Sequence, residues 1–455
     1  MRGLRLHWAQ SAEVFIAQLL CAAATAIVLT TTCHAQTQPP SPPPVPAQQV
    51  PAPGIPRNPA VVITLDQAIE LARANNPELQ AQRTLVYQNK EQEVTANLRP
   101  NPTLSWDAQY LPIFSPSLAS SDYLNTTAQF DLGAGYLFER GRKRQNRLQA
   151  ARDATSVTSA QVLDTERTTV AAVAQQFVAA LLAKSNLDFA EHFLDGYQHT
   201  VSMCQEQQKA GTMSKADLVK VQLETLQLQR DVTSARIATL QALNTLRELI
   251  GFDGVPRVYD VAGQLAYDPL NASEEELQAK ALSQRPDLEA AERGIAAANS
   301  QIGLAKANAK QDLSATFDYT HVTGVNLAAF YFSIPMPIFN RNQGEVARNY
   351  YVVSQAQWQA KAAHQAVVTD VKNAYETLLN DRDVLQLYDK GYLDKAQESM
   401  DMAQSAFSHG SAALIDYLDA ERSYRSTELS YRQALATYMT SLEQLRLAVG
   451  SRDLR

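Results

Sequence analysis

The stretch Asn76-Pro77-Glu78-Leu79-Gln80-Ala81 recurs in altered form as Arg285-Pro286-Asp287-Leu288-Glu289-Ala290, at an offset of 209 residues. Further along the chain, Gly211 corresponds to Gly410 and Gly251 to Gly450, both at an offset of 199 residues. The second copy is therefore shorter by ten residues, which are missing around the strands described below. A period of roughly 200 residues is far longer than the repeat of a solenoid. The pattern predicts a chain built from two related halves.

Each half is predicted to contain an opening helix, two strands and a long helical hairpin. Capping boxes begin the opening helices, with Thr64 and Gln67 in the first half and Ser273 and Glu276 in the second. Alternation of apolar and polar residues predicts strands at 104–110, 124–136 and 313–319, and a weaker pattern predicts one near 325–334. The expected fold class is mainly α with a small β part.

The helices after the strands are expected to be unusually long. Residues 142–209 contain no proline and would span roughly 100 Å as one helix. The helix that returns from Gly211 shows a heptad seam: Leu218, Val221, Thr225, Leu228, Val232, Ala235, Thr239, Ala242, Leu246 and Leu249. A second apolar stripe holds Val219, Leu223 and Leu226. Two apolar flanks are typical of a helix with neighbours on both sides and water in front.

Composition and motifs exclude several classes of function. The formal net charge of −7 argues against a nucleic-acid partner, which would require a basic face. The sequence has no glycine-rich phosphate loop and no Gly-x-Ser-x-Gly elbow. We therefore expect no enzyme activity, no cofactor and no resident metal site.

The N-terminus has the pattern of an export signal. Residues 1–35 combine Arg2 and Arg5, an apolar run at 14–29 and small residues before Gln36, which predicts a cleaved signal peptide. The alternative is a lipoprotein acylated at Cys33, although Thr30 stands where a lipobox has leucine. Residues 36–60 are rich in proline and are predicted to form a linker.

Any membrane crossing is expected to use strands, because no later apolar run approaches the roughly 20 residues of a membrane helix. The side chains predicted to face lipid are Leu104, Trp106, Ala108, Tyr110 and Phe130. Those predicted to face a lumen are Ser105, Asp107, Gln129 and Asp131. Four strands cannot close a barrel, and open edges are not tolerated in lipid. Several copies of the chain must therefore pool their strands.

These motifs together resemble the TolC-like outer-membrane efflux proteins. The motifs that carry the resemblance are Leu65-Asp66-Gln67-Ala68-Ile69 with Asn76-Pro77-Glu78-Leu79, the copy Arg285-Pro286-Asp287-Leu288, two Gly-x5-Asp hairpin tips, and the closing Leu249-Ile250-Gly251 and Ala448-Val449-Gly450. The resemblance implies one repeat at 61–251, a second at 274–450, an equatorial segment at 252–273 and a short tail at 451–455. Residues 139–147 are similar to a segment of the cobalt–zinc–cadmium subgroup, whose pattern has glycine where Arg142 stands; the other interpretation is a plain basic patch.

The resemblance implies a passive exit duct from the periplasm to the exterior. Three copies would form an α-helical periplasmic tube and share one β-barrel in outer-membrane lipid. A periplasmic adaptor would connect the tube to an inner-membrane transporter of the resistance–nodulation–division type. The alternative is an exported structural or adhesion coiled-coil protein without transport activity.

The hairpin tips are the candidate functional sites. The resemblance implies adaptor docking at Gly211, Thr212, Asp217, Gly410 and Ser411. Asp416 and Asp419 are three residues apart and share a helix face, and by motif position they match acidic residues at the periplasmic gate of the family. Phe407 would narrow the same opening. The alternatives are plain hairpin turns and a solvated helix face.

Overall fold

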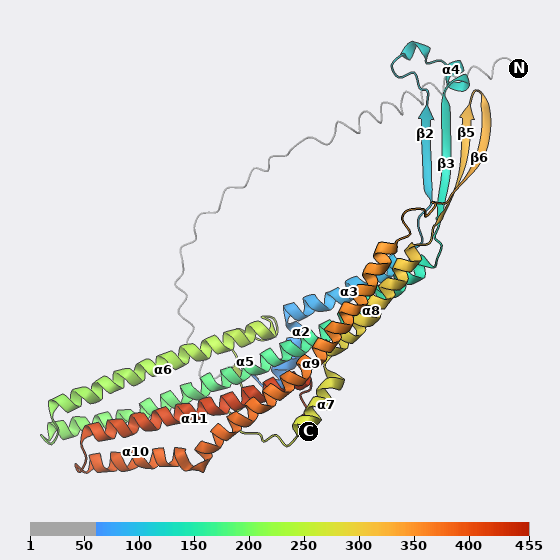
Figure 1. Cartoon of the computed structure of the whole chain (residues 1–455). Coiled ribbons are helices and arrows are strands. Elements are labelled where there is room, and N and C mark those ends of the chain that lie inside the picture. The colour runs from blue at the N-terminus through green and yellow to red at the C-terminus, as the bar shows by residue number, and fades with distance from the viewer. Residues whose placement is uncertain (1–60, 455) are drawn as a thin grey trace. The chain divides into compact units, whose positions relative to one another are not determined.

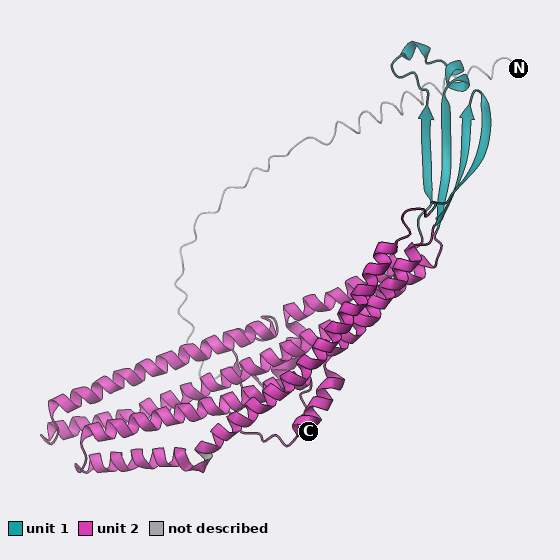
Figure 2. Cartoon of the chain, in the orientation of Figure 1, with its two compact units in different colours: residues 1–54, 100–138, 312–336 teal, residues 55–99, 139–311, 337–455 magenta. Residues whose placement is uncertain are grey.

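The structure is a computed structural model that describes residues 61–454, apart from the side chain of Asp389. The predicted signal peptide, the linker and Cys33 lie outside the described residues. The chain divides into two compact units (Figure 2). The sheet unit contains residues 100–138 and 312–336, and the helical unit contains the remaining described residues.

Strands from both halves form one antiparallel sheet in the order β2-β3-β5-β6 (Figure 1). The strands are β2 (Thr103–Gln109), β3 (Gln129–Phe138), β5 (Leu313–Val322) and β6 (Val325–Ser333). Strand β3 pairs with β5, so the sheet joins the two halves. Within the described residues β2 and β6 each have one partner, which leaves two open sheet edges in a single chain.

The predicted strand at 124–136 starts too early. A 3₁₀ turn, η1 (Pro116–Leu118), and helix α4 (Ser121–Thr126) precede β3. The Ser120 hydroxyl accepts a hydrogen bond from the N–H of Tyr123 at 3.1 Å and caps α4. This local cap stabilises a helical turn where alternation alone predicted a strand.

Each predicted opening helix is in fact two helices. They are α2 (Leu65–Asn75) and α3 (Pro77–Asn97) in the first half, and α7 (Glu274–Gln284) and α8 (Pro286–Asn308) in the second. The breaks fall before Pro77 and Pro286 because proline disfavours helical conformation in the residue that precedes it. Both predicted capping boxes, at Thr64 and Ser273, are confirmed.

The long hairpins differ between the halves. The first consists of α5 (Lys143–Lys209), which is continuous over 67 residues as predicted, and α6 (Lys215–Ile250). The second consists of α9 (Gln343–Leu387), α10 (Leu393–Ser408) and α11 (Leu414–Val449). A π-helical segment, η2 (Tyr388–Tyr392), separates α9 from α10, and Gly391 within it has a φ of 92°. The sequence did not predict this interruption.

The predicted seam of α6 is confirmed at five of its ten positions: Val221, Leu228, Val232, Thr239 and Leu246. Its buried side chains are Val221, Glu224, Leu228, Val232, Thr239, Leu243, Leu246 and Ile250. Ile250 replaces the predicted Leu249 because a straight helix drifts from a strict heptad repeat. The second stripe is exposed in a single chain, with Val219, Leu223 and Leu226 at 44%, 60% and 61% exposure.

Among the described residues, α5 contains an 18-residue window that is apolar enough to cross a membrane, with a mean hydropathy of 1.2. The expectation that no such run follows the leader was therefore wrong. Half of this window is buried, and Val173, Phe177 and Ala180 belong to the core that α5 shares with α2 and α6. Core packing accounts for its apolar composition.

Three clusters of buried side chains hold the helical unit together. The first-half core includes the short parallel pair β1 (Val62–Ile63) and β4 (Asp260–Val261). The second-half core lies between α7, α9 and α11. The third cluster, the hairpin core, consists of Tyr197, Cys204, Val221, Leu228, Phe407, Leu414, Tyr417 and Leu418, and it joins the two hairpins near their tips.

Candidate functional site

The repeated motif of the first half lies at a helix junction. The Asn76 side chain accepts a hydrogen bond from the N–H of Leu79 at 2.8 Å and donates one to the carbonyl oxygen of Leu249 at 2.7 Å. Gly251 has a φ of 98°, and a Cβ there would lie 2.4 Å from the carbonyl oxygen of Asn75. The opening and closing motifs of the repeat are therefore contact partners.

Arg285 fastens the equivalent junction of the second half. It donates to the carbonyl oxygen of Ala448 at 3.2 Å and pairs with Asp287 at 2.6 Å and Asp370 at 2.9 Å. Its side chain is 5% exposed. Burial favours a raised pKa for Asp287, but the hydrogen bond and charge of Arg285 outweigh burial and lower the pKa. In the second half, two ion pairs of the buried Arg285 guanidinium thus take the place of the Asn76 amide.

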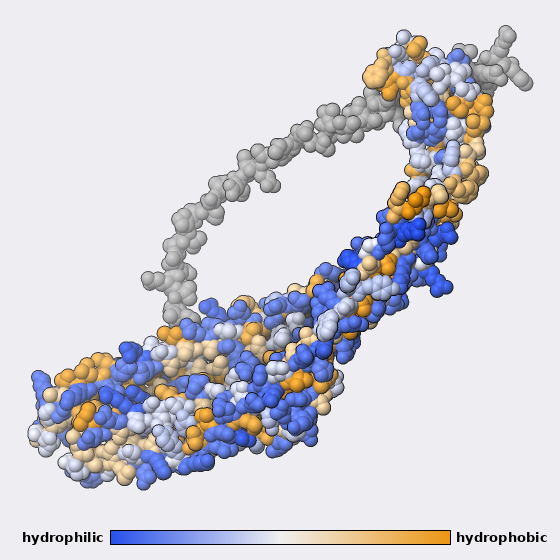
Figure 3. All heavy atoms as spheres, viewed as in Figure 1, coloured by the Kyte–Doolittle hydropathy of each residue, from blue (hydrophilic) through white to orange (hydrophobic). Residues whose placement is uncertain are grey.

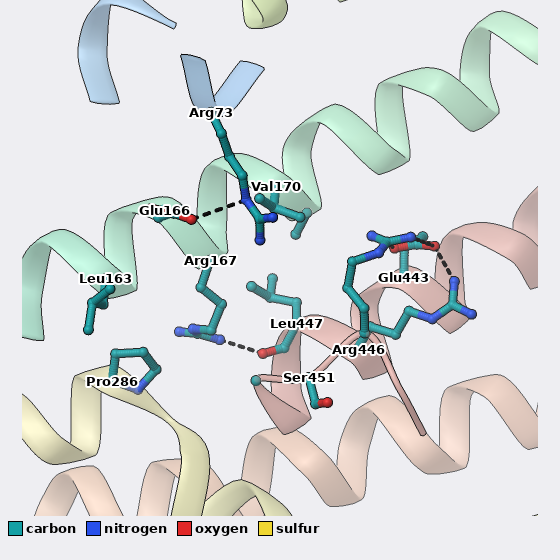
Figure 4. A pocket seen from close by; sticks show the side chains of 13 residues that line it. Arg73, Leu163, Glu166, Arg167, Val170, Pro286, Glu443, Arg446, Leu447 and Ser451 are labelled. Carbon is teal, nitrogen blue, oxygen red and sulfur yellow. Dashed lines mark hydrogen bonds and ion pairs between the residues drawn. The ribbon is translucent and has the colours of Figure 1, made fainter. Parts of the chain in front are cut away.

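A cavity of about 240 Å³ lies where the halves meet (Figure 4). Arg73 pairs with Glu166 at 3.1 Å, and Arg167 donates to the carbonyl oxygen of Leu447. Across the cavity Glu443 pairs with Arg446 and Arg452. These arginines all contact carboxylates or a carbonyl, so the cavity is a junction that ties α2 and α5 to the end of α11.

The sheet has two chemically distinct faces. Trp106 lies opposite Leu132 and Ala108 opposite Phe130, while the intervening Asp107 lies opposite Asp131. The apolar face also includes Leu104, Phe317, Tyr319, Phe330 and Phe332. Leu104 and Trp106 are 78% and 70% exposed, and the apolar residues of the sheet unit appear orange in Figure 3. The predicted residues of β2 and β3 divide between the two faces as their alternation indicated. On β5 and β6 the division is weaker, because His321 and Asn326 lie on the apolar face and Leu327 and Tyr331 on the polar face. Which face meets lipid stays a prediction.

Tyr110 does not belong to the strand in which it was predicted. Strand β2 ends at Gln109, and Tyr110 has a φ of 55°. A left-handed residue breaks the alternation of side chains, so its direction does not follow from the strand pattern. On the polar face, Gln129 donates to Asp131 at 2.8 Å and Gln109 donates to Asp107 at 3.0 Å.

The two tips have matching turns. Gly211 and Gly410 have φ values of 79° and 73°, a region that glycine enters without steric cost. The hydroxyl groups of Thr212 and Ser411 each donate to a carbonyl oxygen five residues earlier at 3.0 Å. Asp217 accepts hydrogen bonds from Lys220 and Ser214, which lower its pKa. The predicted turn conformation is confirmed, and adaptor docking stays a prediction.

Both predicted gate aspartates are exposed near the start of α11. The Asp416 carboxylate accepts a hydrogen bond from the N–H of Ala413 at 3.3 Å and so caps the helix. Asp419 lies 3.9 Å from Arg422, and its side chain is 68% exposed. The structure brings the two carboxylates to one helix face, as their spacing predicted.

The prediction that Phe407 narrows the periplasmic opening does not agree with its position in the structure. Its side chain is 8% exposed. The ring stacks on Tyr417, with centroids 5.5 Å apart and planes inclined by 5°. Phe407 therefore packs α10 against α11 within the hairpin core and is not free to narrow an opening.

The backbone conformation at Arg142 explains one feature of the basic segment after β3. Arg142 has a φ of 58° and precedes α5, which explains why the subgroup pattern has glycine there. Arg147 pairs with Glu139 of the same chain at 2.7 Å and donates to the carbonyl oxygens of Ala96 and Leu98 at 3.0 and 3.1 Å. Arg147 therefore holds the start of α5 to the end of α3.

Comparison with known proteins identifies the family. The model of the outer membrane efflux protein family matches residues 68–252 and 277–451. The chain belongs to the outer membrane efflux protein family. The predicted function, an outer-membrane exit duct of a multi-component efflux pump, is confirmed by this membership and by the relatives. The alternative of an exported structural or adhesion protein is set aside.

One relative is named for metal resistance and another for cation efflux. The chain is 24% identical over 373 residues to the cobalt-zinc-cadmium resistance protein CzcC of Cupriavidus metallidurans, covering 82% of this chain and 86% of that protein. It is 29% identical over 276 residues to the cation efflux system protein CusC of Escherichia coli K12, covering 56% of this chain and 58% of that protein. The similarity to the cobalt–zinc–cadmium subgroup is thus confirmed.

Solved structures share the fold. A crystal structure of CusC aligns with a TM-score of 0.69 at 21% identity, covering 85% of this chain and 92% of that one. The open state of the outer membrane channel MtrE of Neisseria gonorrhoeae aligns with a TM-score of 0.68 at 21% identity, covering 86% and 90%. The predicted fold class is confirmed.

Proposed function

We propose that three copies of this chain form one channel that releases heavy-metal cations across the outer membrane. A periplasmic adaptor would dock at the hairpin tips and connect the channel to an inner-membrane transporter of the resistance–nodulation–division type. The observation that carries the proposal is the four-stranded sheet, which has two open edges and, on β2 and β3, an apolar and a polar face.

The sheet supports pooling of strands between copies. Unpaired N–H and C=O groups at the edges of β2 and β6 would be costly in lipid. Strands β3, β5 and β6 contain 10, 10 and 9 residues, close to what a tilted strand needs to cross a bilayer. Pairing of β2 with β6 of the next copy would satisfy both edges. It would also turn the apolar face of the sheet toward lipid.

The exposed faces of α6 and α10 also support contacts between copies. Helix α6 exposes Leu223 and Leu226, and α10 exposes Met402. Exposed Lys220 and Arg230 flank Leu223 and Leu226 on α6, and exposed Glu398 and Asp401 lie on α10. Apolar side chains flanked by opposite charges are complementary. We propose that α6 of one copy packs against α10 of the next.

The cargo is inferred from the relatives and from charge. CzcC is named for cobalt, zinc and cadmium resistance and CusC for cation efflux. The polar sheet face carries Asp107, Asp131 and Asp318, and Asp416 and Asp419 project from α11. Carboxylates along a water-filled path favour cations. Another relative, OpmQ of Pseudomonas aeruginosa, is named for pyoverdine export, so cargo varies within the family.

Growth on metal salts tests the cargo. Deletion of the gene should increase sensitivity to cobalt, zinc or cadmium ions, and the wild-type gene should restore growth. Sensitivity to drugs with unchanged metal tolerance would contradict the cation proposal and leave the channel intact. Unchanged sensitivity to every compound in a strain that produces the protein would count against an efflux role.

We also propose that the signal peptide is removed after Ala35. The mature chain would lie in the outer membrane with a long periplasmic part. SilC of Salmonella typhimurium, a relative at 26% identity, is named a probable lipoprotein, so acylation of Cys33 is the competing outcome. The intact mass of the mature protein distinguishes a free N-terminus at Gln36 from a lipidated cysteine.

A further inference from the structure

A fully buried acid lies beside the hairpin core without a partner. Glu421 on α11 is 1% exposed. Neither of its carboxylate oxygens has a hydrogen-bond partner among the described residues. Burying an ionised carboxylate is costly unless hydrogen bonds or opposite charges compensate. Glu421 is therefore not explained by packing alone.

The groups around Glu421 come from three helices. Helix α5 contributes Tyr197, helix α6 contributes Glu224, and α11 contributes Tyr417, Arg422 and Arg425. Tyr197 is 3% exposed and its hydroxyl has no hydrogen-bond partner within the described chain. The Tyr417 hydroxyl is 3.4 Å from that of Thr200. Among the described residues, none of these groups donates a hydrogen bond to Glu421.

The nearby arginines are held by another acid. Glu224 is 7% exposed, and its two oxygens lie 2.7 Å from Arg422 and 3.5 Å from Arg425. Arg425 also lies 3.7 Å from Asp231, and Arg422 lies 3.9 Å from Asp419. Glu421 and Glu224 thus compete for Arg422 and Arg425, and both arginines pair with Glu224.

These conditions favour the neutral form of Glu421. Burial raises the pKa of Glu421 from 4.5 to about 7, and the negative charge of Glu224 adds to this rise, while Arg425 and Arg422 oppose it. A proton on one oxygen removes the uncompensated charge. It also gives the side chain a donor for a neighbouring oxygen.

We propose that Glu421 is a proton-binding site whose occupancy sets how tightly α11 packs against the α5–α6 hairpin. With the proton bound, the side chain is a neutral filler of the interface. Without it, the interface contains an unpaired negative charge next to Glu224, and separation of α11 from α5 lets water reach that charge. Only the step from this packing to the channel entrance, through Asp416 and Asp419 on the same helix, rests on the proposed function.

The direction of the pH effect follows from linkage. A carboxyl group whose pKa is higher in the folded than in the unfolded chain favours folding most at low pH. Its contribution falls as the pH rises from about 4.5 to about 7. We therefore expect a tight interface below pH 5 and a looser one above pH 8.

Cys204 reports on this interface. Its thiol is buried at 0% exposure within the hairpin core. We would measure the rate at which a small maleimide modifies Cys204 in the full-length protein in outer-membrane vesicles, reading the Cys204 peptide by mass spectrometry. The same rate would be measured for Glu421→Gln, which keeps the shape of the side chain and cannot ionise. Dividing the wild-type rate by the Glu421→Gln rate at each pH removes the effect of the titration of the Cys204 thiol, which is common to both proteins.

The expected ratio of wild-type to Glu421→Gln is smallest near pH 4.5, rises by about tenfold or more toward pH 7, and levels off above that pH. The control Glu206→Gln removes an exposed acid near Cys204 on α5 and should keep the wild-type pH profile. A ratio that stays constant with pH would overturn the proposal. Should Glu421→Gln fail to assemble at pH 8, Glu421→Met provides the second neutral variant.

Thermal unfolding gives an independent readout. The two neutral variants should match the wild type at pH 5 and unfold at a higher temperature at pH 8.5, whereas equal differences at both pH values would contradict proton binding. Neither readout depends on transport. Loss of metal efflux with a normal labelling profile would count against the proposed cargo, not against the proton site.

Discussion

Asn76 and Arg285 occupy equivalent positions but fasten their helices by different chemistry. Each reaches the last turn of the return helix of its own half, at Leu249 and Ala448. The amide of Asn76 needs two neutral hydrogen bonds, whereas Arg285 needs two carboxylates. The sequence predicted the motif as a helix start, but the contact could not be predicted because its partner lies 173 residues away for Asn76.

Removal of Arg285 should be the costlier change of the two. Arg285→Met removes the partner of Asp370 and, among the described residues, leaves Asp287 with only Arg167 at 4.0 Å. Because both carboxylates are partly exposed, the cost should lie below the roughly 3–5 kcal/mol of a fully buried pair. Asn76→Ala loses a cap, typically about 1 kcal/mol. The exposed pair of Arg382 with Asp383 provides the control, because Arg382→Ala should leave stability nearly unchanged. Denaturant unfolding in detergent measures all three; equal losses would contradict the buried network.

Asp416 and Asp419 are expected to act through charge. The double variant Asp416→Asn, Asp419→Asn keeps the shape of the α11 face and removes two negative charges per copy. Cation selectivity and block by multivalent cations should both weaken in single-channel recordings. Asp195→Asn, on an exposed part of α5, should leave both unchanged. Unaltered selectivity and block in the double variant would remove these residues from the gate.

Secondary structure followed from periodicity where the pattern was long and from local chemistry where it was short. The unbroken α5 and the alternating β5 were predictable because a period of 3.6 or 2 extends over many residues. Helix α4 was missed because one serine caps a short turn, and η2 was missed because a single glycine, Gly391, interrupts an otherwise helical stretch. Such local events leave little periodic signal.

Bulky residues at the tips should separate docking from folding. In Gly211→Leu and Gly410→Leu a side chain enters the left-handed region, which costs roughly 1–2 kcal/mol, but no atom lies within 4 Å of either new Cβ. We expect intact trimers and lost resistance. Gly196→Ala is the matched control, since this glycine is inside α5 with nothing within 4 Å. Adaptor cross-linking that persists in both tip variants would move docking elsewhere.

The faces of β2 should differ in solvent access. Single cysteines at Trp106 and Asp107 place a thiol on the apolar and the polar face of one strand. A lipid-soluble reagent should label the first and a water-soluble reagent the second. Leu104 and Ser105 repeat the comparison one pair earlier along the strand. Equal labelling of positions 106 and 107 by the water-soluble reagent would contradict the barrel assignment.

At the scale of the whole molecule, the duplicated halves form two helical hairpins and one sheet. Among the residues that the structure describes, the edges of that sheet have no partner strand within a single chain. The sequence predicted this incompleteness from the strand number and from the second stripe of α6, whose Leu223 and Leu226 are exposed. It could not predict which edges meet, because a contact between copies imposes no spacing within one sequence. The open edges at β2 and β6 now restrict the choice.

Disulfide cross-linking of β2 to β6 between copies, in outer-membrane vesicles, tests the account most directly. Cysteines at Asp107 or Gln109 on β2 would be combined with cysteines at Ala329 or Tyr331 on β6, all on the polar face. A closed ring predicts a ladder of oxidised species that ends at three copies. A ladder that continues beyond three copies, or no cross-link for any combination, would contradict a barrel shared by three chains.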